Sequence, residues 1–309
     1  MLKYILFRLL QVIPVLFGTT FLIFFMVFSM PGDPILALFG DQGPSSPEIL
    51  AEIRAQYNLD KPFIMQYLIY MGGVFQGNFG IDFSGRPIAD QLVKTIPVTA
   101  LLALMATVFE FILAVVIGTY AGLRKGKFFD NSSLIVALIL LSMPIFVLAF
   151  IFQQTLGLNM KLFPVTVGSN VSVYSLFLPA AVLAIGGYAA SMRLTRASTI
   201  DTLNQDFVRT AYAKGLSRRR VLPVHVMRNS LIPTVTNAAI NFGTLLVGAT
   251  ITEGIFNVPG VGNTLYQAIR KGENTTIVGF VTFMVLAYLL INLLVDLLYA
   301  VLDPRIRYV

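Results

Sequence analysis

The sequence predicts an all-α membrane protein with six transmembrane helices. Of its 309 residues, 56% are hydrophobic and only 12% are charged, and the mean hydropathy is +0.79. These values lie outside the range of ordinary soluble domains. Because the chain has no cysteine, disulfides and cysteine-based metal sites are excluded.

Six apolar stretches support this prediction, because a helix of about 20 residues crosses the ~30 Å of hydrocarbon in a bilayer. The first follows two basic residues, as a signal peptide does, but its apolar core is too long for one and no small-x-small cleavage motif follows. We therefore expect it to be a span. The fourth stretch is on the short side. The predicted spans are Leu9–Met30, Val98–Leu123, Ser132–Leu156, Leu176–Met192, Thr234–Thr252 and Ile277–Val301.

The distribution of Lys and Arg predicts which helix ends face the cytoplasm. If the N-terminus is inside, most of the 22 basic residues fall in cytoplasmic segments, and the densest group lies in residues 193–228. Both termini are therefore expected in the cytoplasm. The net charge of +7 then reflects orientation in the bilayer, and we expect no nucleic-acid partner.

The predicted spans divide the chain into three parts. An N-terminal cytoplasmic end and the first span occupy residues 1–30, and an external helical segment occupies residues 31–97. A core of five spans occupies residues 98–309 and includes a cytoplasmic loop at residues 193–233.

The external segment carries helix signals of its own. Ser46-Pro47-Glu48 is typical of a helix start, and that helix should end near Leu59. A second helix is expected over Phe63–Phe75, with turns in the glycine-rich stretch Gly72–Gly80. We expect the segment either to pack as a lid on the helix ends or to form a docking or gating surface.

A second external element is expected within Thr252–Ile269. Pro259, Gly260 and Gly262 should interrupt the helix there, and Asn263–Ile269 could form a short helix at membrane depth. Irregular backbone at that depth is tolerated only where it is buried in protein or lines a watery cavity. The pattern favours a re-entrant element at the mouth of a pathway.

Small residues and one proline predict how the spans pack. Gly118 and Gly122 have the spacing that lets two helices approach closely, and the pair Gly186-Gly187 should do the same in the fourth span. Pro144 should kink the third span.

A short helix is predicted in the cytoplasmic loop. Asp206 is a suitable N-cap, Gly215 a suitable residue just beyond the C-terminus, and Lys214 a favourable cation in the last turn. A helix of about eight residues is ~12 Å long and is not stable alone in water, so it should dock on another structure. An apolar stripe offers a surface for this contact: Phe207, Val208, Ala211 and Tyr212.

The loop carries a resemblance to a known family. DFVRTAYAKGLSRRRV (Asp206–Val221), followed by RNSLIP (Arg228–Pro233), resembles the EAA-type cytoplasmic loop of ABC importer permeases, in the version of the dipeptide, oligopeptide and nickel branch. Three further stretches resemble that branch in the same order, closest to its B-type subunits: LLQVIPVLFGTTFLIFFMVFSMPGDP (Leu9–Pro34), TEGIFNVPGVG (Thr252–Gly262) and NLLVDLLYAVLDPRIR (Asn292–Arg307).

The resemblance implies a type I ABC importer permease fold in a prokaryotic cell membrane, with this chain forming half of a translocation pathway for di- or oligopeptides. It implies four kinds of partner chain or ligand: a homologous second permease, two ATPase subunits or domains, an external substrate-binding protein and the peptide. ATP and Mg²⁺ would be bound by the ATPases, so we expect no cofactor and no enzyme activity in this chain. The nearest approach to a phosphate loop, GLRKGKF (Gly122–Phe128), is one residue short and lacks the Ser or Thr that binds Mg²⁺.

The resemblance also implies a role for the loop helix, as a coupling helix that fits a groove on the ATPase. The sequence has Arg209-Thr210-Ala211 where Glu-Ala-Ala is usual in the wider family. The residues carried over to this role are Asp206, Phe207, Arg209, Thr210, Ala211, Tyr212, Ala213, Lys214 and Gly215.

Ionisable residues within the spans are candidates for the pathway. Glu110 lies near the middle of the second span, where it could stay protonated and hydrogen-bond across helices, or line the pathway and attract a peptide ammonium group. Glu253 is the second pathway candidate, although a structural role near water is favoured for it and for Asp296. His225 has no neighbours at ligand spacing, so no metal or acid–base site is expected there.

Other functions remain open on the sequence alone. The same architecture could import a nickel chelate or glutathione. A proton-coupled secondary transporter could use Glu110, Glu253 and Asp296, but the chain shows no clear inverted repeat. A membrane enzyme is disfavoured because Ser, His and acidic residues do not converge in any span.

Overall fold

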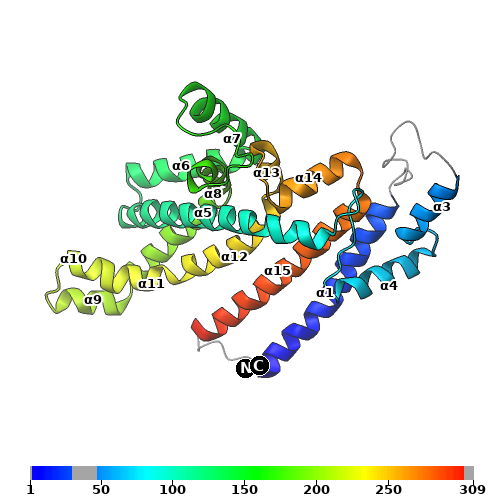
Figure 1. Cartoon of the computed structure of the whole chain (residues 1–309). Helices are drawn as coiled ribbons and strands as arrows, with labels where there is room; N and C mark the ends of the chain where they lie inside the picture. The colour runs from blue at the N-terminus through cyan, green and yellow to red at the C-terminus, as the bar shows by residue number, and fades with distance from the viewer. Residues whose placement is uncertain (1, 30–46, 303–309) are drawn as a thin grey trace. The chain divides into compact units, whose positions relative to one another are not determined.

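A computed structural model describes residues 2–29 and 47–302 of the chain. Within these ranges the regular elements are helices, apart from one isolated bridge between Ile81 and Pro87 (Figure 1). The helices are α1 (Leu2–Phe28), α3 (Pro47–Gln56), α4 (Phe63–Val74), α5 (Ile88–Leu123), α6 (Phe128–Ser142), α7 (Ile145–Phe152), the π-helix η2 (Gln153–Asn159), α8 (Val173–Leu203), α9 (Asp206–Ala213), α10 (Arg218–Val221), the π-helix η3 (Leu222–Met227), α11 (Arg228–Ser230), α12 (Ile232–Gly248), α13 (Thr250–Phe256), α14 (Val261–Lys271) and α15 (Asn274–Leu302).

Six spans are present if two bent helix pairs each count as one. In the described chain, α1, α5, α8 and α15 are each long and apolar enough to cross a membrane. The fifth and sixth are the pair formed by α6 with α7–η2, bent by 101°, and the pair α12–α13, bent by 61°. The all-helical prediction is confirmed. The division of the chain at 30/31 and 97/98, which rests on membrane sides, stays a prediction.

Two spans are much longer than hydropathy predicted. α5 has 36 residues and starts at Ile88 rather than Val98, with Pro97 inside it, and α8 has 31 residues although Leu176–Met192 looked short. α8 begins early because Ser172 and Ser175 form a capping box. It continues past Met192 because Thr195 and Thr199 bury their side chains on one face. Hydropathy measures the membrane crossing, and these polar extensions carry no such signal.

One proline and one glycine differ in detail from the predictions made for them. Pro144 does more than kink the third span: Met143 and Pro144 are extended, and α7 starts as a new helix. Gly72 lies within α4, so the predicted turn begins only after Val74, and Gly77 has the positive φ of 80°.

The predicted helices of the external segments are largely confirmed. α4 agrees with the expected second helix, and α3 starts at Pro47, whereas its expected cap Ser46 lies outside the described residues. The helix expected at Asn263–Ile269 is α14, which is longer at both ends, so Gly262 lies inside a helix instead of breaking one.

The chain forms two compact units. One comprises residues 1–99 and 259–309, and the other comprises residues 100–258. In the first unit, α1 and α15 run side by side, as Figure 1 shows, and α14 packs on α15. The amide of Asn274 at the start of α15 donates to the carbonyl of Val27 near the end of α1 (3.3 Å).

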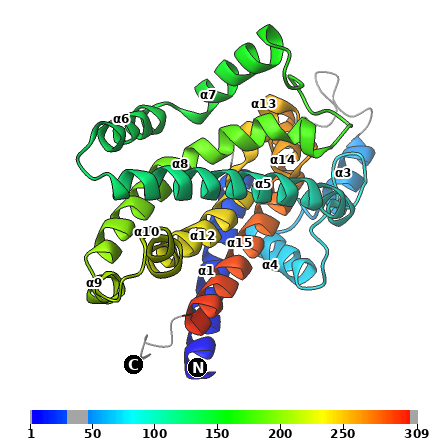
Figure 2. The same ribbon diagram turned by 90° about the vertical axis from the view of Figure 1, so that its left-hand side faces the viewer.

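The second unit is organised around α8. This helix contacts α6, α7, α11, α12 and α13 (Figure 2). α5 also approaches α8 closely: a Cβ on Gly118 would lie 2.7 Å from the carbonyl oxygen of Met192, and one on Gly122 would lie 2.9 Å from Thr199 Cβ. The predicted packing role of both glycines is confirmed, because any side chain there would push the helices apart.

We expect Gly118→Ala to destabilise the chain. Overpacking of a tight contact costs about 1–3 kcal/mol, and the near neighbour here is backbone that cannot rotate away. Thermal unfolding in detergent should show a midpoint lower by several degrees. Gly18→Ala in α1 is the matched control, since nothing lies within 4 Å of its Cβ position; equal midpoints for the two variants would contradict the close-packing explanation.

Candidate functional site

The cytoplasmic loop folds as a small helical structure that starts directly after α8. α9 runs from Asp206 to Ala213, and Gly215 adopts φ +78° just beyond it, as predicted. The predicted cap is wrong by one residue. Gln205 is the N-cap and makes no side-chain capping bond, while Asp206 is the first helical residue and pairs with Arg209 at 3.5 Å on the surface.

One face of α9 is buried within the loop itself. Val208 and Ala211 are 1% and 4% exposed, and they form an apolar cluster with Val221 and Val226 of the following helices α10 and η3. The cluster is closed by partly buried leucines: Leu203, Leu216 and Leu222. The short helix is therefore stabilised by its own chain, which a helix of eight residues requires.

The predicted apolar stripe divides into two parts with different surroundings. Val208 and Ala211 face the loop's cluster, whereas Phe207 and Tyr212 are each 43% exposed. At 100° per residue, these two rings border the buried pair on either side. The prediction that all four residues form one docking surface is corrected: the inner two pack inside the chain.

The remaining positions assigned to the coupling helix lie at the surface of the loop. Eight of the nine assigned positions are exposed, the two rings among them, and Ala211 is the buried one. The exposed members of the set are Asp206, Phe207, Arg209, Thr210, Tyr212, Ala213, Lys214 and Gly215.

The arginine-rich part of the loop contains both surface and structural charges. Arg218, Arg219 and Arg220 form α10 and are exposed. Arg196 in α8 instead pairs with the fully buried Asp130 of α6, with Nη2 2.7 Å from Oδ2. Asp130 also accepts the amide of Gly126 (2.7 Å). This ion pair connects the α5–α6 turn to α8. A count of positive charges in the sequence could not distinguish Arg196, which has a structural role, from the exposed arginines.

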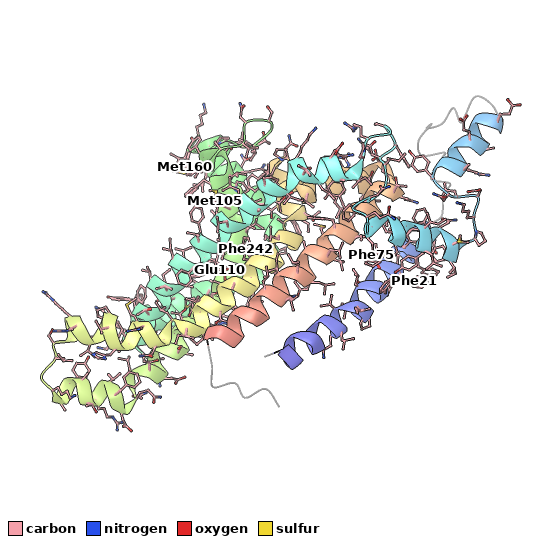
Figure 3. All side chains as sticks on the ribbon, turned by 60° about the horizontal axis from the view of Figure 1, so that its bottom comes forward. Phe21, Phe75, Met105, Glu110, Met160 and Phe242 are labelled. Carbon is pink, nitrogen blue, oxygen red and sulfur yellow. The ribbon has the colours of Figure 1, made fainter. Side chains whose placement is uncertain are left out.

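Glu110 lies in a buried polar network between three helices. Its side chain, labelled in Figure 3, is 2% exposed on α5. Its Oε1 accepts hydrogen bonds from Ser191 Oγ (2.5 Å) on α8 and Asn241 Nδ2 (2.6 Å) on α12. Gly187 makes room for the carboxyl group, because a Cβ there would lie 2.5 Å from the carboxyl carbon. The sequence left two roles open for Glu110: hydrogen bonding across helices, or lining the pathway. The structure contains the hydrogen bonds across helices. The pathway role stays a prediction.

The network continues along the face of α12 that meets α8. Asn237 Nδ2 donates to Ser191 Oγ (2.8 Å), and the hydroxyls of Thr234 and Thr195 are 2.9 Å apart. Sequence reasoning missed these partners. The spacing of Thr234, Asn237 and Asn241 within an apolar helix was the available signal, since polar residues three or four apart share a helix face.

Two other ionisable residues, Glu253 and Asp296, were considered from the sequence. Glu253 is fully buried in α13, and its pathway role stays a prediction. The side chain of Asp296 lies outside the described residues. Among the residues that the structure describes, no group of three His, Cys, Asp or Glu could hold a metal ion.

Several apolar helices able to span a bilayer, with a loop of short helices between two of them, define a multi-pass membrane protein. Comparison with known proteins makes this specific. The family described as "Binding-protein-dependent transport system inner membrane component" matches residues 114–308, and its N-terminal region, described as "Binding-prot-dependent transport system membrane comp, N-term", matches residues 1–103.

Two relatives match over all or nearly all of their length. The chain is 36% identical over 338 residues to the dipeptide transport system permease protein DppB of Escherichia coli (strain K12), covering 100% of this chain and 99% of DppB. It is 35% identical over 309 residues to the glutathione transport system permease protein GsiC of the same strain, covering all of both chains.

The chain therefore belongs to the binding-protein-dependent transport system inner membrane component family. It is a multi-pass inner membrane protein with the type I ABC permease fold, and it is a permease subunit of an ABC importer in the dipeptide/oligopeptide branch. The resemblance read from the four sequence stretches is confirmed. Such a subunit acts with ATPase and substrate-binding partners, and membership in this family is inconsistent with a self-contained proton-coupled transporter.

We expect Gly187→Ala to disturb the Glu110 network, because the new methyl group would occupy the position of the carboxyl group. The adjacent Gly186→Ala is a matched control whose nearest neighbour is 3.7 Å away. Thermal unfolding should show a loss of about 1–3 kcal/mol for Gly187→Ala alone. Glu110→Gln keeps an acceptor oxygen and should fold normally. If it folds normally but transports poorly, Glu110 also has a pathway role.

We expect Ala211→Leu and Ala213→Leu to act differently although they lie two residues apart. Ala211 is buried in the loop's cluster, so a larger side chain there should open the loop and increase its cleavage in limited proteolysis. Ala213 is exposed, so its variant should be cleaved like the wild type. Identical cleavage rates for the two variants would contradict the packing of α9.

Proposed function

We propose that this chain is the permease subunit of an importer for dipeptides. The support is its full-length similarity to DppB, a dipeptide permease protein, with slightly lower identity to the glutathione permease protein GsiC. Glutathione, itself a small peptide, is the second candidate cargo. Because both relatives are named for peptides, a peptide is a better candidate than a nickel chelate.

We propose that the chain supplies one half of the pathway. The chain has up to six possible spans, and, as the family of binding-protein-dependent permeases suggests, a homologous second permease would supply the other half. Two ATPase subunits or domains would bind ATP and Mg²⁺, and an external binding protein would deliver the substrate. This chain would then need neither a cofactor nor catalytic residues.

We propose that α9 is the coupling helix, and the observation that carries this is its division into two faces. The inner face is occupied by the loop's own cluster, so the helix keeps its shape without a partner. Phe207 and Tyr212 leave large apolar areas uncovered at its borders, beside charged and small residues. Large exposed rings beside polar groups are typical of protein–protein contacts, and an ATPase groove would cover them.

Movement of α9 would reach the membrane through continuous helical structure. α9 packs on η3, and η3 leads through α11 into α12, whose polar face bonds to α8 and Glu110. Closure of the ATPases on ATP would move the loop as one body, and the attached spans would open toward the binding protein. The loop must then be cytoplasmic, in agreement with the orientation predicted from its basic residues.

The proposal is tested by isolating the tagged chain from mild detergent with its partners. We expect ATPase subunits in the recovered complex, and ATP hydrolysis that a dipeptide-loaded binding protein stimulates. Stimulation by glutathione instead of dipeptides would select the second cargo. Recovery of a lone chain that transports without ATP would contradict the proposal.

Removal of the two exposed rings tests the coupling role in that complex. We expect the double variant Phe207→Ala and Tyr212→Ala to fold normally and to lower substrate-stimulated ATP hydrolysis at least tenfold, a loss of about 1.4 kcal/mol or more. Arg219→Gln, a neutralised charge on α10, is the control and should change stimulation far less. Equal activity of the double variant and the control would contradict the role of α9.

A further inference from the structure

The helix α4 has an apolar face that nothing in the described first unit covers. α4 has 12 residues, and its large side chains on this face, with Phe75 just after it, are each between 39% and 67% exposed. An apolar patch of this kind is unusual on a surface that meets water. The residues of this face are Ile64, Met65, Leu68, Ile69 and Phe75.

An adjoining face of α4 packs against α1. Tyr67, Met71 and Val74 are buried there. The Tyr67 hydroxyl lies 2.9 Å from Thr20 Oγ1 and donates to the carbonyl of Phe17 (3.1 Å). α4 is therefore apolar on two adjoining faces, and the residues that the structure describes bury only one of them.

Ring contacts show which part of α1 lies beside α4. The ring of Phe63, at the start of α4, is 5.8 Å from that of Phe25, and the ring of Phe75, just past its end, is 6.1 Å from that of Phe17. From Phe25 to Phe17, α1 rises about 12 Å. α4 therefore slants along the C-terminal half of a helix that spans the membrane over Leu10–Phe28.

The length of α4 fits a helix that enters a membrane without crossing it. Twelve helical residues extend ~18 Å, whereas crossing requires ~30 Å. The chain returns through a turn in which the amides of Gln76 and Asn78 both donate to the carbonyl of Gly73 (2.9 Å each). The turn also packs on α15, since a Cβ on Gly279 would lie 2.8 Å from the Phe79 carbonyl oxygen. Irregular backbone at membrane depth needs internal bonds and protein contacts of this kind.

The uncovered face of α4 continues the lipid-facing surface of α1. Phe21, Leu22 and Phe25 are exposed on α1, and Figure 3 labels Phe21 on α1 and Phe75 directly after α4. No charged residue occurs between Lys61 and Asp82. Aromatic rings also gather where α4 meets the end of α1, as they do at membrane interfaces.

We propose that α4 is embedded in the membrane leaflet at the C-terminal end of α1, with its uncovered face against lipid acyl chains. With the orientation that the basic residues predict, this is the outer leaflet. The segment between the first two spans is then anchored in the bilayer through α4. The uncovered face of α4 then contacts lipid and does not dock a soluble protein.

The absence of cysteine from this chain allows a direct test. A spin label is attached to Leu68→Cys in the complete complex in phosphatidylcholine vesicles, and its collision rates with oxygen and with a water-soluble nickel chelate are measured. The complex that carries the wild-type chain is the blank for labels on partner subunits. Leu22→Cys on the exposed face of α1 is the lipid reference, and Lys61→Cys before α4 is the water reference.

We expect the label at position 68 to collide more with oxygen than with the nickel chelate, as the label at position 22 does, and to be unchanged when the substrate-binding protein is added. Access to the chelate equal to that at position 61 would overturn the proposal, because the face would then meet water. Protection from both reagents, before or after the binding protein is added, would also overturn it, because a protein would then cover α4.

Discussion

The close approach of α5 to α8 is the contact on which the second unit depends. Gly118 and Gly122 let the two backbones approach closely. Between the same two helices, Ser191 of α8 donates a hydrogen bond to the buried Glu110 of α5. A membrane offers no water to satisfy a carboxyl group, so a buried acid must find its donors within the protein. The close packing of α5 on α8 and the hydrogen bonds of Glu110 therefore depend on each other. If the two helices separate, the carboxyl group loses its donor on α8.

α8 carries this requirement from the membrane to the cytoplasmic loop. It extends for about 46 Å, and its polar end is held by the pair Arg196–Asp130 and by the packing of Thr199 against Gly122. α9 starts only three residues after α8 ends. A movement of the loop therefore acts on α8, which contacts its neighbours at several points along its length. The hydrogen bonds from α12 are also made to α8.

The loop shows how a helix too short to be stable alone can serve as a mechanical part. Val208 and Ala211 supply its stability from within, through contacts with Val221 and Val226. The residues left outside are then free to match a partner, because they do not also have to hold the helix together. This separation explains why a bulky residue at Ala211 should damage the loop itself, whereas changes at Tyr212 should act on the contact.

Sequence reasoning predicted the helical class, α4, the position of α9 and the packing glycines, because each has a local signal in hydropathy, capping or spacing. It did not predict the length of α8 or the partners of Glu110. Those depend on which faces of distant helices meet: Ser191, Asn237 and Asn241 acquire their roles only when α8 and α12 pack beside α5. For the same reason, Arg196 could not be told apart from the surface arginines until Asp130 was placed next to it.

The most direct test of the account asks which residues of the loop touch an ATPase. A photoactivatable crosslinker is attached to Tyr212→Cys or to Val224→Cys, two exposed positions in a chain with no other cysteine, within the assembled complex. We expect crosslinks to the ATPase from position 212 that change when ATP is added, and far fewer from position 224. Equal crosslinking from both positions, or none from position 212 in an intact complex, would contradict it.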